Sequence, residues 1–343
     1  MGLANAEVWL SPVEHLVWDQ DVARSNRVTS TSGTKAALRI PGGPPLHFPP
    51  FQNILSLGPG GIGACREGDM KAREILHHFN SQATWVDRHP TVDRILLGDP
   101  DRDVRTVLVT WMSTMKAIRY AVENGFDLLM THEPTFWIHD NEVEKLDAKE
   151  ESAAKLATAA LKRRLVEESG LVVERNHDCW DRYPDIGIPW ALAQHLGMKG
   201  LPFATGNRGF QLAYEIGPTR ADELAERIAA RTVALGDPYV QRFGDGRKIV
   251  RRLGIGTGCA CRPDVFLEMG CDAAVVCDDG CRYWSDVSWA VDSGMPLFRV
   301  GHGTSEEPGM VSLTKYINDS LPGLKAQHFK LDLAVDYVDG RST

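Results

Sequence analysis

The sequence predicts an α/β protein made of two linked lobes, with mixed, largely parallel sheets and a metal cleft between them. Apolar strand-like runs alternate with helix-like runs from residue 94 to residue 319, a pattern typical of parallel strands joined by covering helices. Several strand-like runs end on histidine or carboxylate residues, and ligands in open α/β sheets gather at the carboxyl ends of strands. With 343 residues, the chain is long enough to form two modest domains.

The composition is that of an ordinary globular chain and excludes some partners. The hydrophobic fraction is 43%, the charged fraction is 24% and the net charge is −8, so the bulk charge does not favour nucleic acid or anionic membranes. No apolar run approaches the roughly 20 residues that span a bilayer, and the N-terminus lacks the pattern of a secretion signal. We therefore expect a cytoplasmic protein that binds neither membrane nor nucleic acid.

The N-terminal 69 residues differ from the rest of the sequence. They contain the chain breakers Gly42-Gly-Pro-Pro45 and Gly58-Pro-Gly-Gly-Ile-Gly63 with little periodicity between them, a composition that favours turns and disorder. We expect this segment to be a poorly ordered extension, or a mis-annotated start that precedes the true initiator Met70. The predicted units are an extension (1–69) and an α/β domain (70–343), the latter with lobe one at about 70–200 and lobe two at about 201–343.

The first lobe is expected to begin with an amphipathic helix over residues 70–79, preceded by Asp69 in the N-cap position. Strand-like runs lie at 94–97, 105–111, 126–131 and 171–176. Helix-like runs lie at about 114–123, 147–168 and 188–196. Each of these three is followed within a few residues by glycine, which commonly ends helices. The basic run Lys162-Arg-Arg164 is expected on a solvated helix face.

The second lobe repeats the alternation. Strands are expected near 212–216, 249–255, 273–277 and 297–300, and helices near 220–235, 263–269, 283–292 and 310–319. Gly254-Ile-Gly-Thr-Gly258 follows a strand but lacks the GxGxxG spacing, and no helix opens directly from it. We therefore expect a tight turn where the backbone approaches a ligand or a neighbouring loop, and not a dinucleotide site.

Five of the seven cysteines lie between residues 259 and 281. A structural zinc site usually shows two closely spaced cysteine pairs. Because the spacing here does not, we expect these cysteines to act as small buried residues. Without a secretion signal, the thiols are expected to stay reduced. A serine hydrolase is not indicated either, since the G-x-S-x-G elbow is absent from the sequence.

Metal-capable side chains follow three of the predicted strands. The candidates are His132, Glu133, Asp181, His302 and Glu306. Imidazole nitrogens and carboxylate oxygens together suit a divalent cation, and two ions about 3.5–4 Å apart can clamp a substrate oxygen and activate water. Five such residues suffice for two ions only if one carboxylate bridges them and water fills the remaining positions.

Several alternatives stay open at these positions. Histidines at strand ends are often only hydrogen-bonded, and Asp178 and Glu307 are close enough in sequence to replace a neighbouring carboxylate. His177 is as readily a substrate contact or an outer contact as a ligand. His302 and Glu306 would share one face of a helix, although the glycines around His302 favour a turn equally.

Four segments together resemble a known family. They are Ile95-Leu-Leu-Gly-Asp-Pro-Asp101 with the strand at 104–109, Thr131-His-Glu-Pro134, His177-Asp-Cys-Trp-Asp181 and Val300-Gly-His-Gly-Thr-Ser-Glu306. The last three are similar to Thr-His-His-Pro, His-Thr-Asn-Leu-Asp and Ala-Gly-His-Tyr-x-x-Glu of the NGG-interacting-factor-3-like proteins. These are also called dinuclear-metal-centre hexameric proteins or type 2 GTP cyclohydrolase I-like proteins. The resemblance runs from about Met70 to His328.

The resemblance implies a metal site and an activity. The implied ligands of two divalent ions per chain are His132, Glu133, Asp181, His302 and Glu306. The ions would be zinc, iron, manganese or magnesium. The resemblance further implies a homohexamer and a metal-dependent hydrolase of the type 2 GTP cyclohydrolase I kind, acting on a small molecule that the sequence does not identify.

Two departures from the family pattern bear on this activity. Glu133 replaces the second histidine of the pair. A carboxylate is a harder donor than an imidazole, so it would favour magnesium, manganese or iron over zinc, or it would weaken one of the two metal positions. Trp111-Met112 stands where the family commonly has Leu-Asp, so one usual acid is missing. Both departures favour the alternative of a non-catalytic metal-binding scaffold or regulator that acts through protein partners. A metal-free member is a third possibility.

Overall fold

Two β-sheets with helices on both faces make up the protein, an α/β architecture as predicted. The computed structural model describes residues 70–87 and 90–330, so the extension expected at residues 1–69 lies outside the described residues. A short ribbon of β1 (Met70–Lys71) and β3 (Asp103–Val104) accompanies the sheets. No helix in this described part is long and apolar enough to cross a membrane.

The first sheet has five strands in the order β13-β4-β5-β6-β2. Their bounds are β2 (Arg94–Leu97), β4 (Thr106–Met112), β5 (Leu128–Glu133), β6 (Val172–Arg175) and β13 (Lys325–His328). Neighbours are parallel except for β6 and β2. Parallel neighbours need a crossover connection, which helices supply between β4, β5 and β6. This sheet is therefore largely parallel, as the sequence predicts.

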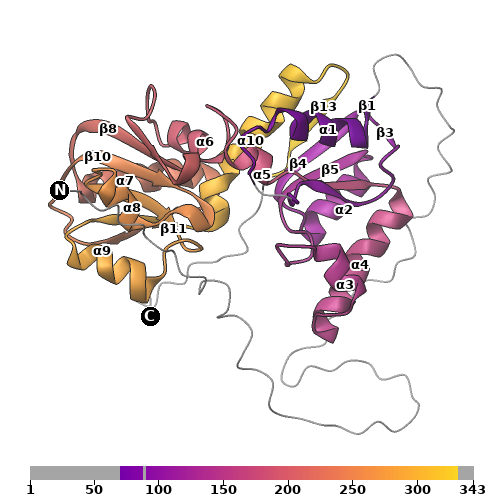
Figure 1. Ribbon diagram of the computed structural model, residues 1–343, viewed down its shortest axis with the longest axis horizontal. Coiled ribbons are helices and arrows are strands. Elements are labelled where there is room, and N and C mark those ends of the chain that lie inside the picture. Colours follow the sequence, from indigo (N-terminus) through magenta and orange to yellow (C-terminus); the bar gives the residue numbers. More distant parts are fainter. Residues whose placement is uncertain (1–69, 88–89, 331–343) are drawn as a thin grey trace, which may run out of the picture. The chain divides into compact units, whose positions relative to one another are not determined.

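Helices cover both faces of the first sheet (Figure 1). They are α1 (Ala72–Gln82), α2 (Met115–Glu123), α4 (Ala153–Ser169) and α10 (His302–Ser320). Val107 and Val109 of β4 belong to the core that α1 and α10 cover, whereas Leu108 between them belongs to the core under α2 and α4. Because side chains alternate along a strand and both faces are covered, the centre of β4 is a continuous apolar run.

The second sheet has six strands in the order β7-β8-β10-β11-β12-β9. Their bounds are β7 (Ala204–Gly206), β8 (Gln211–Arg220), β9 (Gln241–Phe243), β10 (Ile249–Gly256), β11 (Ala273–Cys277) and β12 (Leu297–Val300). Only β10, β11 and β12 are parallel neighbours; the pairs made by β7, β8 and β9 are antiparallel. The second sheet is therefore mixed, and only its centre matches a parallel arrangement.

Four helices flank the second sheet, two on each face. α6 (Ile188–His195) and α7 (Ala221–Thr232) contribute to one core, and α8 (Pro263–Glu268) and α9 (Ser288–Asp292) flank the other. The remaining short helices are α3 (Glu142–Asp147), α5 (Asp178–Asp181), η1 (Asn207–Gly209), η2 (Val233–Leu235), η3 (Gly258–Ala260) and η4 (Tyr283–Val287).

Three helix boundaries differ from the sequence prediction. Met70–Lys71 pairs with Asp103–Val104, so α1 begins only at Ala72, with Lys71 and not Asp69 in the N-cap position. The helix predicted at 147–168 begins only at Ala153, because Ser152 caps α4 by accepting a hydrogen bond from Lys155 N at 3.4 Å. The last helix, predicted at 310–319, begins eight residues earlier.

The C-terminal elements of the predicted second lobe belong to the first sheet. α10 follows β12 directly, yet Met310, Leu313 and Ile317 pack into the core of the first sheet. β13 then pairs in parallel with β4. The boundary near residue 200 remains a prediction, but residues after about 302 return to the first sheet. This return brings the start of α10 to the carboxyl end of β5.

Candidate metal centre

The end of β5 supplies two buried polar residues, His132 and Glu133. The Nδ1 atom of His132 lies 3.2 Å from the main-chain oxygen of Asn176. A carbonyl oxygen only accepts hydrogen bonds, so Nδ1 carries a hydrogen and Nε2 is the nitrogen that is left to bind a cation. This backbone contact is the one that typically orients a metal-binding histidine.

The Nε2 atom of His132 faces two carboxylates. It lies 3.4 Å from Asp181 Oδ1 and 3.5 Å from Glu306 Oε2. Within the described residues this buried nitrogen has no hydrogen-bond partner. Two carboxylates favour a positive charge at this nitrogen, which either a proton or a metal ion can supply. The donor set therefore fits a divalent ion.

The first turn of α10 supplies the second histidine and its partner carboxylate. His302 Nε2 lies 3.1 Å from Glu306 Oε1 and 3.5 Å from Glu133 Oε1. Asp278 Oδ1 accepts a hydrogen bond from His302 N at 2.7 Å. It thereby satisfies one of the backbone N–H groups that have no partner within the helix at its start. His302 and Glu306 thus lie one helical turn apart, and the alternative of a turn at the flanking glycines is wrong.

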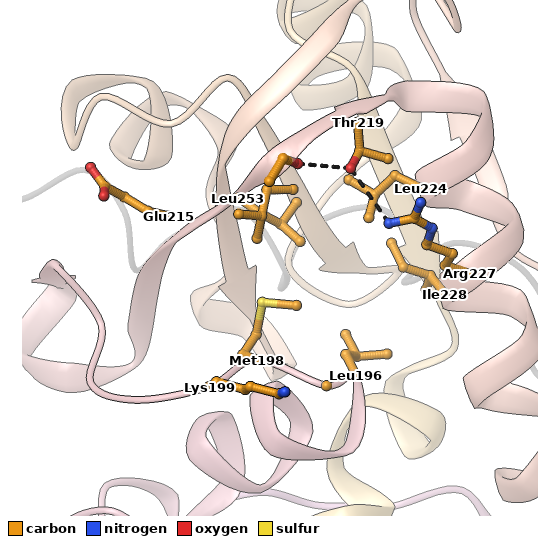
Figure 2. A pocket seen from close by; sticks show the side chains of 12 residues that line it. Leu196, Met198, Lys199, Glu215, Thr219, Leu224, Arg227, Ile228 and Leu253 are labelled. Carbon is orange, nitrogen blue, oxygen red and sulfur yellow. Dashed lines mark hydrogen bonds between the residues drawn. The ribbon is translucent and has the colours of Figure 1, made fainter.

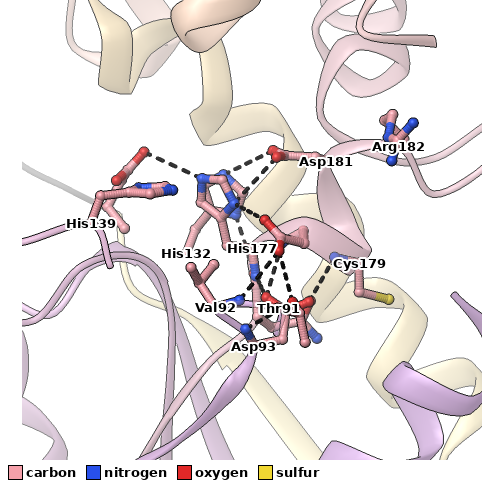
Figure 3. Close-up of polar contacts among 12 residues, drawn as sticks. Thr91, Val92, Asp93, His132, His139, His177, Cys179, Asp181 and Arg182 are labelled. Atoms are coloured by element: carbon pink, nitrogen blue, oxygen red, sulfur yellow. Dashed lines mark hydrogen bonds and ion pairs between the residues drawn. The ribbon is translucent and has the colours of Figure 1, made fainter. Parts of the chain in front are cut away.

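His177 precedes α5 and lies between carboxylates (Figure 3). Its Nδ1 is 3.1 Å from Asp178 Oδ1 and 3.3 Å from Asp181 Oδ2, and its Nε2 is 4.0 Å from Glu133 Oε1. Its ring stacks on His132 with centroids 4.5 Å apart. Burial opposes protonation, but the neighbouring carboxylates outweigh it and raise the pKa of His177 to about 9. In the ion-free protein His177 is therefore a cation at neutral pH.

The pair formed by His302 and Glu306 is also charged. Burial lowers the pKa of His302, yet the contact with Glu306 raises it to about 11. Burial likewise disfavours the Glu306 carboxylate, but His302 lowers the pKa of Glu306 to about 2. Protons on the histidines thus neutralise the carboxylates in the ion-free protein, and a divalent ion would have to displace them.

The candidate donors form three overlapping groups whose atoms lie within 4.8 Å of one another. The groups are His132, His177 and Asp181; Glu133, His139 and His177; and His132, Glu133 and Glu306. These groups contain four of the five predicted ligands and His177, and His302 joins them through its contacts with Glu133 and Glu306. Their role as metal ligands remains a prediction. These groups contain only nitrogen and oxygen donors, the set that zinc, iron, manganese and magnesium share.

Two site residues have roles that sequence reasoning missed. Trp111, the last residue but one of β4, donates a hydrogen bond from Nε1 to Glu306 Oε2 at 2.8 Å. Arg175, at the end of β6, donates from Nε to the main-chain oxygen of His132 at 3.0 Å and from Nη1 to that of His139 at 2.7 Å. Their positions in the sequence could have identified them, because Trp111 and Arg175 lie at the ends of the strands that flank β5.

The expectations for the glycine-rich turn and the cysteines hold only in part, because Gly254 and Gly256 belong to β10 and Cys259 is exposed. Gly258 has a φ of 52°, and a Cβ atom there would lie 2.7 Å from Glu306 Oε1. The backbone therefore does approach a neighbouring group closely at this turn. Cys261 and Cys277 are buried with their sulfurs 3.9 Å apart, and the three donor groups include no cysteine.

A cavity of about 340 Å³ lies elsewhere, on the second sheet (Figure 2). Its lining includes Leu196, Met198, Leu224, Ile228 and Leu253 and contains none of the predicted ligands. The donor groups and this cavity are therefore separate features, and the candidate centre rests on its donor atoms alone.

Comparison with known proteins agrees with the family resemblance found in the sequence. The profile of the Duf34/NIF3 (NGG1p interacting factor 3) family matches residues 70–336. A Clostridium perfringens protein named GTP cyclohydrolase 1 type 2 homolog is 20% identical over 239 residues, which cover 66% of this chain and 83% of that protein.

Solved structures share the fold. A hypothetical protein of Staphylococcus aureus has a TM-score of 0.62 at 16% identity, covering 78% of this chain and 99% of its own. A Bacillus cereus protein related to NIF3 has a TM-score of 0.61 at 12% identity, covering 79% of this chain and 99% of its own. At these identities the likeness concerns the fold.

Proposed function

Because the chain belongs to the Duf34/NIF3 (NGG1p interacting factor 3) family, we propose that it is a metal-dependent hydrolase with two divalent ions per chain. The observation that carries this proposal is the buried Nε2 atom of His132, which lacks a hydrogen-bond partner among the described residues and faces two carboxylates. A divalent ion held by this nitrogen and both carboxylates would satisfy all three side chains. The metal cleft between the lobes is part of the same proposal.

The distances divide the donors into two sets. His132, Asp181 and Glu306 Oε2 would hold one ion, and His302, Glu133 and Glu306 Oε1 would hold the other. Glu306 belongs to both sets, so it is the carboxylate that would bridge. A set this rich in carboxylate favours manganese, iron or magnesium more than a pair of histidines would.

The ions, when bound, would lower the pKa of water and polarise a substrate oxygen. The protein's own contribution is to orient these donors and to hold a proton nearby. His177 keeps its Nδ1 toward Asp178 and Asp181, so its other nitrogen, near Glu133, is the group that can pass a proton to a leaving atom. We propose that His177 acts in this way and not as a ligand.

GTP is the first substrate to test, since the name of the curated relative points to opening of its purine ring. The proposed reaction class is hydrolysis at an electrophilic carbon or phosphorus. We also propose a homohexamer, which light scattering of the full chain would test directly.

A non-catalytic metal-binding scaffold is the second candidate. One observation favours it: Arg175 Nη2 lies 4.0 Å from Glu133 Oε2, and a fixed cation beside a donor carboxylate competes with an ion for it. In such a protein the second ion would bind weakly, and the site would stabilise the structure without turning over substrate.

Elemental analysis of the full chain tests the proposal. We expect about two ions per chain in the wild type and clear losses in His302→Ala and Asp181→Ala. The control His195→Ala should be unchanged, because His195 Nε2 lies against the main-chain oxygen of Arg231 and not against a candidate donor. No ions above background after loading with manganese, iron or zinc would overturn the metal site. Loaded protein that leaves GTP and a panel of phosphoesters intact would instead support the scaffold.

A further inference from the structure

Trp111 touches both side chains that α10 contributes to the candidate centre. Its indole Nε1 donates to Glu306 Oε2 at 2.8 Å. Its ring meets the His302 imidazole edge-on, with centroids 5.2 Å apart and an interplanar angle of 74°. A residue of the first sheet thus contacts both the carboxylate and the imidazole of the helix that follows β12.

The backbone of α10 leaves room for the indole. A Cβ atom on Gly303 would lie 3.1 Å from two carbon atoms of the Trp111 ring, closer than ordinary van der Waals contact. Glycine at this position therefore allows the second residue of the helix to lie against the ring. The contact depends on the large indole of Trp111 on β4 and on the absence of a side chain at Gly303 on α10.

We propose that Trp111 is a positioning residue that fixes the Glu306 carboxylate between the two predicted ion positions. This inference rests on the proposed metal function and concerns how one ligand is held. An indole N–H is a donor only, so its bond to Glu306 persists whether or not an ion is bound. A hydrogen bond to a charged acceptor is also stronger than one between neutral groups.

The hydrogen bond determines which way each carboxylate oxygen points. Oε2, bound by Trp111, is held 3.5 Å from His132 Nε2, while Oε1 faces His302 Nε2 at 3.1 Å. Free rotation of the carboxylate would let both oxygens turn toward one ion. With Trp111 in place, one oxygen stays with each histidine, as a bridging ligand requires.

Two substitutions test the contributions of the N–H group and of the aromatic ring of Trp111 separately. Trp111→Phe keeps an aromatic ring and removes the donor, and Trp111→Gln keeps a donor and removes the ring. Loss of an outer contact to a metal ligand typically weakens metal binding by about 10–100-fold. By calorimetric titration of the full chain with Mn²⁺, we expect a loss in that range for Trp111→Phe and a smaller loss for Trp111→Gln.

Fluorescence gives a second readout that packing alone would not change. Paramagnetic Co²⁺ quenches nearby indoles, so its binding should quench part of the wild-type emission. That part should disappear in Trp111→Phe and persist in Trp284→Phe, a matched control in which the replaced indole is 77% exposed on η4. Circular dichroism would verify that each variant is folded.

The outcomes separate this inference from the proposed function. Wild-type protein that binds no Mn²⁺ would overturn both. Wild-type binding with a Trp111→Phe affinity within twofold, or with Trp111→Gln as weak as Trp111→Phe, would overturn the positioning role alone. If Trp111→Phe does not fold, the isosteric benzothienyl analogue at position 111, in which sulfur replaces the N–H group, makes the same distinction.

Discussion

At the level of single residues, the neighbour of a side chain decides its role in the candidate centre. His132 is oriented by the main-chain oxygen of Asn176, and His177 by Asp178 and Asp181. The two imidazoles stack on each other, yet one is proposed to bind an ion through Nε2 and the other to hold a proton. Their residue type alone does not distinguish these roles, because both nitrogens of an imidazole can donate or accept.

Glu133 should control which metal the centre prefers. Replacing it with histidine exchanges a hard oxygen donor for an imidazole nitrogen, which zinc accepts more readily than manganese does. We expect Glu133→His to raise the preference for Zn²⁺ over Mn²⁺ by about 10-fold or more. Competition titrations with both metals would measure this ratio.

Glu133→Gln is the matched control, because it keeps the shape of the side chain and removes the charge. It should weaken binding of both metals without a comparable change in their ratio. An unchanged ratio in Glu133→His would show that Glu133 is not a ligand.

At the level of elements, a buried lysine and a buried glutamate support the loop that follows β5. Lys162 of α4 donates from Nζ to the main-chain oxygen of Thr135 at 2.6 Å, and Glu142 of α3 accepts from Phe136 N at 2.7 Å. Both side chains are buried. The expectation that Lys162 lies on a solvated face is therefore wrong, because α3 and the loop cover that part of α4. This support holds the segment between Glu133 and His139.

Glu142 should make stability depend on pH in a defined direction. Burial, partly offset by the Phe136 N–H, raises the pKa of Glu142 from 4.5 to about 7. The folded state therefore binds the proton more tightly, so this contribution to stability is full below pH 4.5 and lost as pH rises through 7. Relative to Glu142→Gln, wild-type stability should fall by on the order of 3 kcal/mol across this range.

Urea unfolding of both proteins at several pH values between 4.5 and 7.5 would test this. Parallel stability curves would show that folding does not raise the pKa of Glu142. Because Glu142 is not among the predicted ligands, the experiment is best done on metal-free protein.

The packing of α10 on α6 should not tolerate a side chain at Gly309. A Cβ atom there would lie 2.3 Å from Ile188 Cδ1 and 3.2 Å from Ile188 Cα. Overpacking typically costs about 1–3 kcal/mol, while alanine in a helix gains up to about 1 kcal/mol over glycine. We expect Gly309→Ala to destabilise the protein by about 1–2 kcal/mol, measured by urea unfolding.

Gly217→Ala is the control for this effect, since a Cβ atom at Gly217 meets no heavy atom within 4 Å. It should be close to neutral. If Gly309→Ala were equally neutral, the two helices would have to be packed less tightly than the structure shows. Because α10 carries His302 and Glu306, a shifted helix should also weaken metal binding.

At the level of the whole molecule, metal binding should stabilise the fold. A ligand that binds only the folded state stabilises it by about 2.7 kcal/mol when its concentration is 100 times the Kd. We expect Mn²⁺ to raise the melting temperature of the wild type by several degrees. His302→Ala should show little of this rise. An equal rise in both proteins would place the stabilising ion elsewhere.

The sequence identifies most of the strands and helices because their signals are local. The strands at 94–97, 273–277 and 297–300 appear at the predicted bounds, since runs of aliphatic residues between breakers suit buried strands. The six candidate side chains were also identifiable, because metal-capable residues that follow strand-like runs can be read directly from the sequence. The predicted boundaries of elements were wrong where pairing with a segment distant in the chain determines them, as at Met70–Lys71, which pairs with Asp103–Val104.

By itself, then, the sequence determined the α/β class, the order of the elements and the residues with the right chemistry, because periodicity and side-chain type are properties of short segments. Tertiary structure alone decided that α10 and β13 return to the first sheet, that Lys162 is buried and that Trp111 binds Glu306. These outcomes join residues far apart in the chain. The physical reason is that hydrogen bonds and close packing depend on distances in space, which no local pattern specifies.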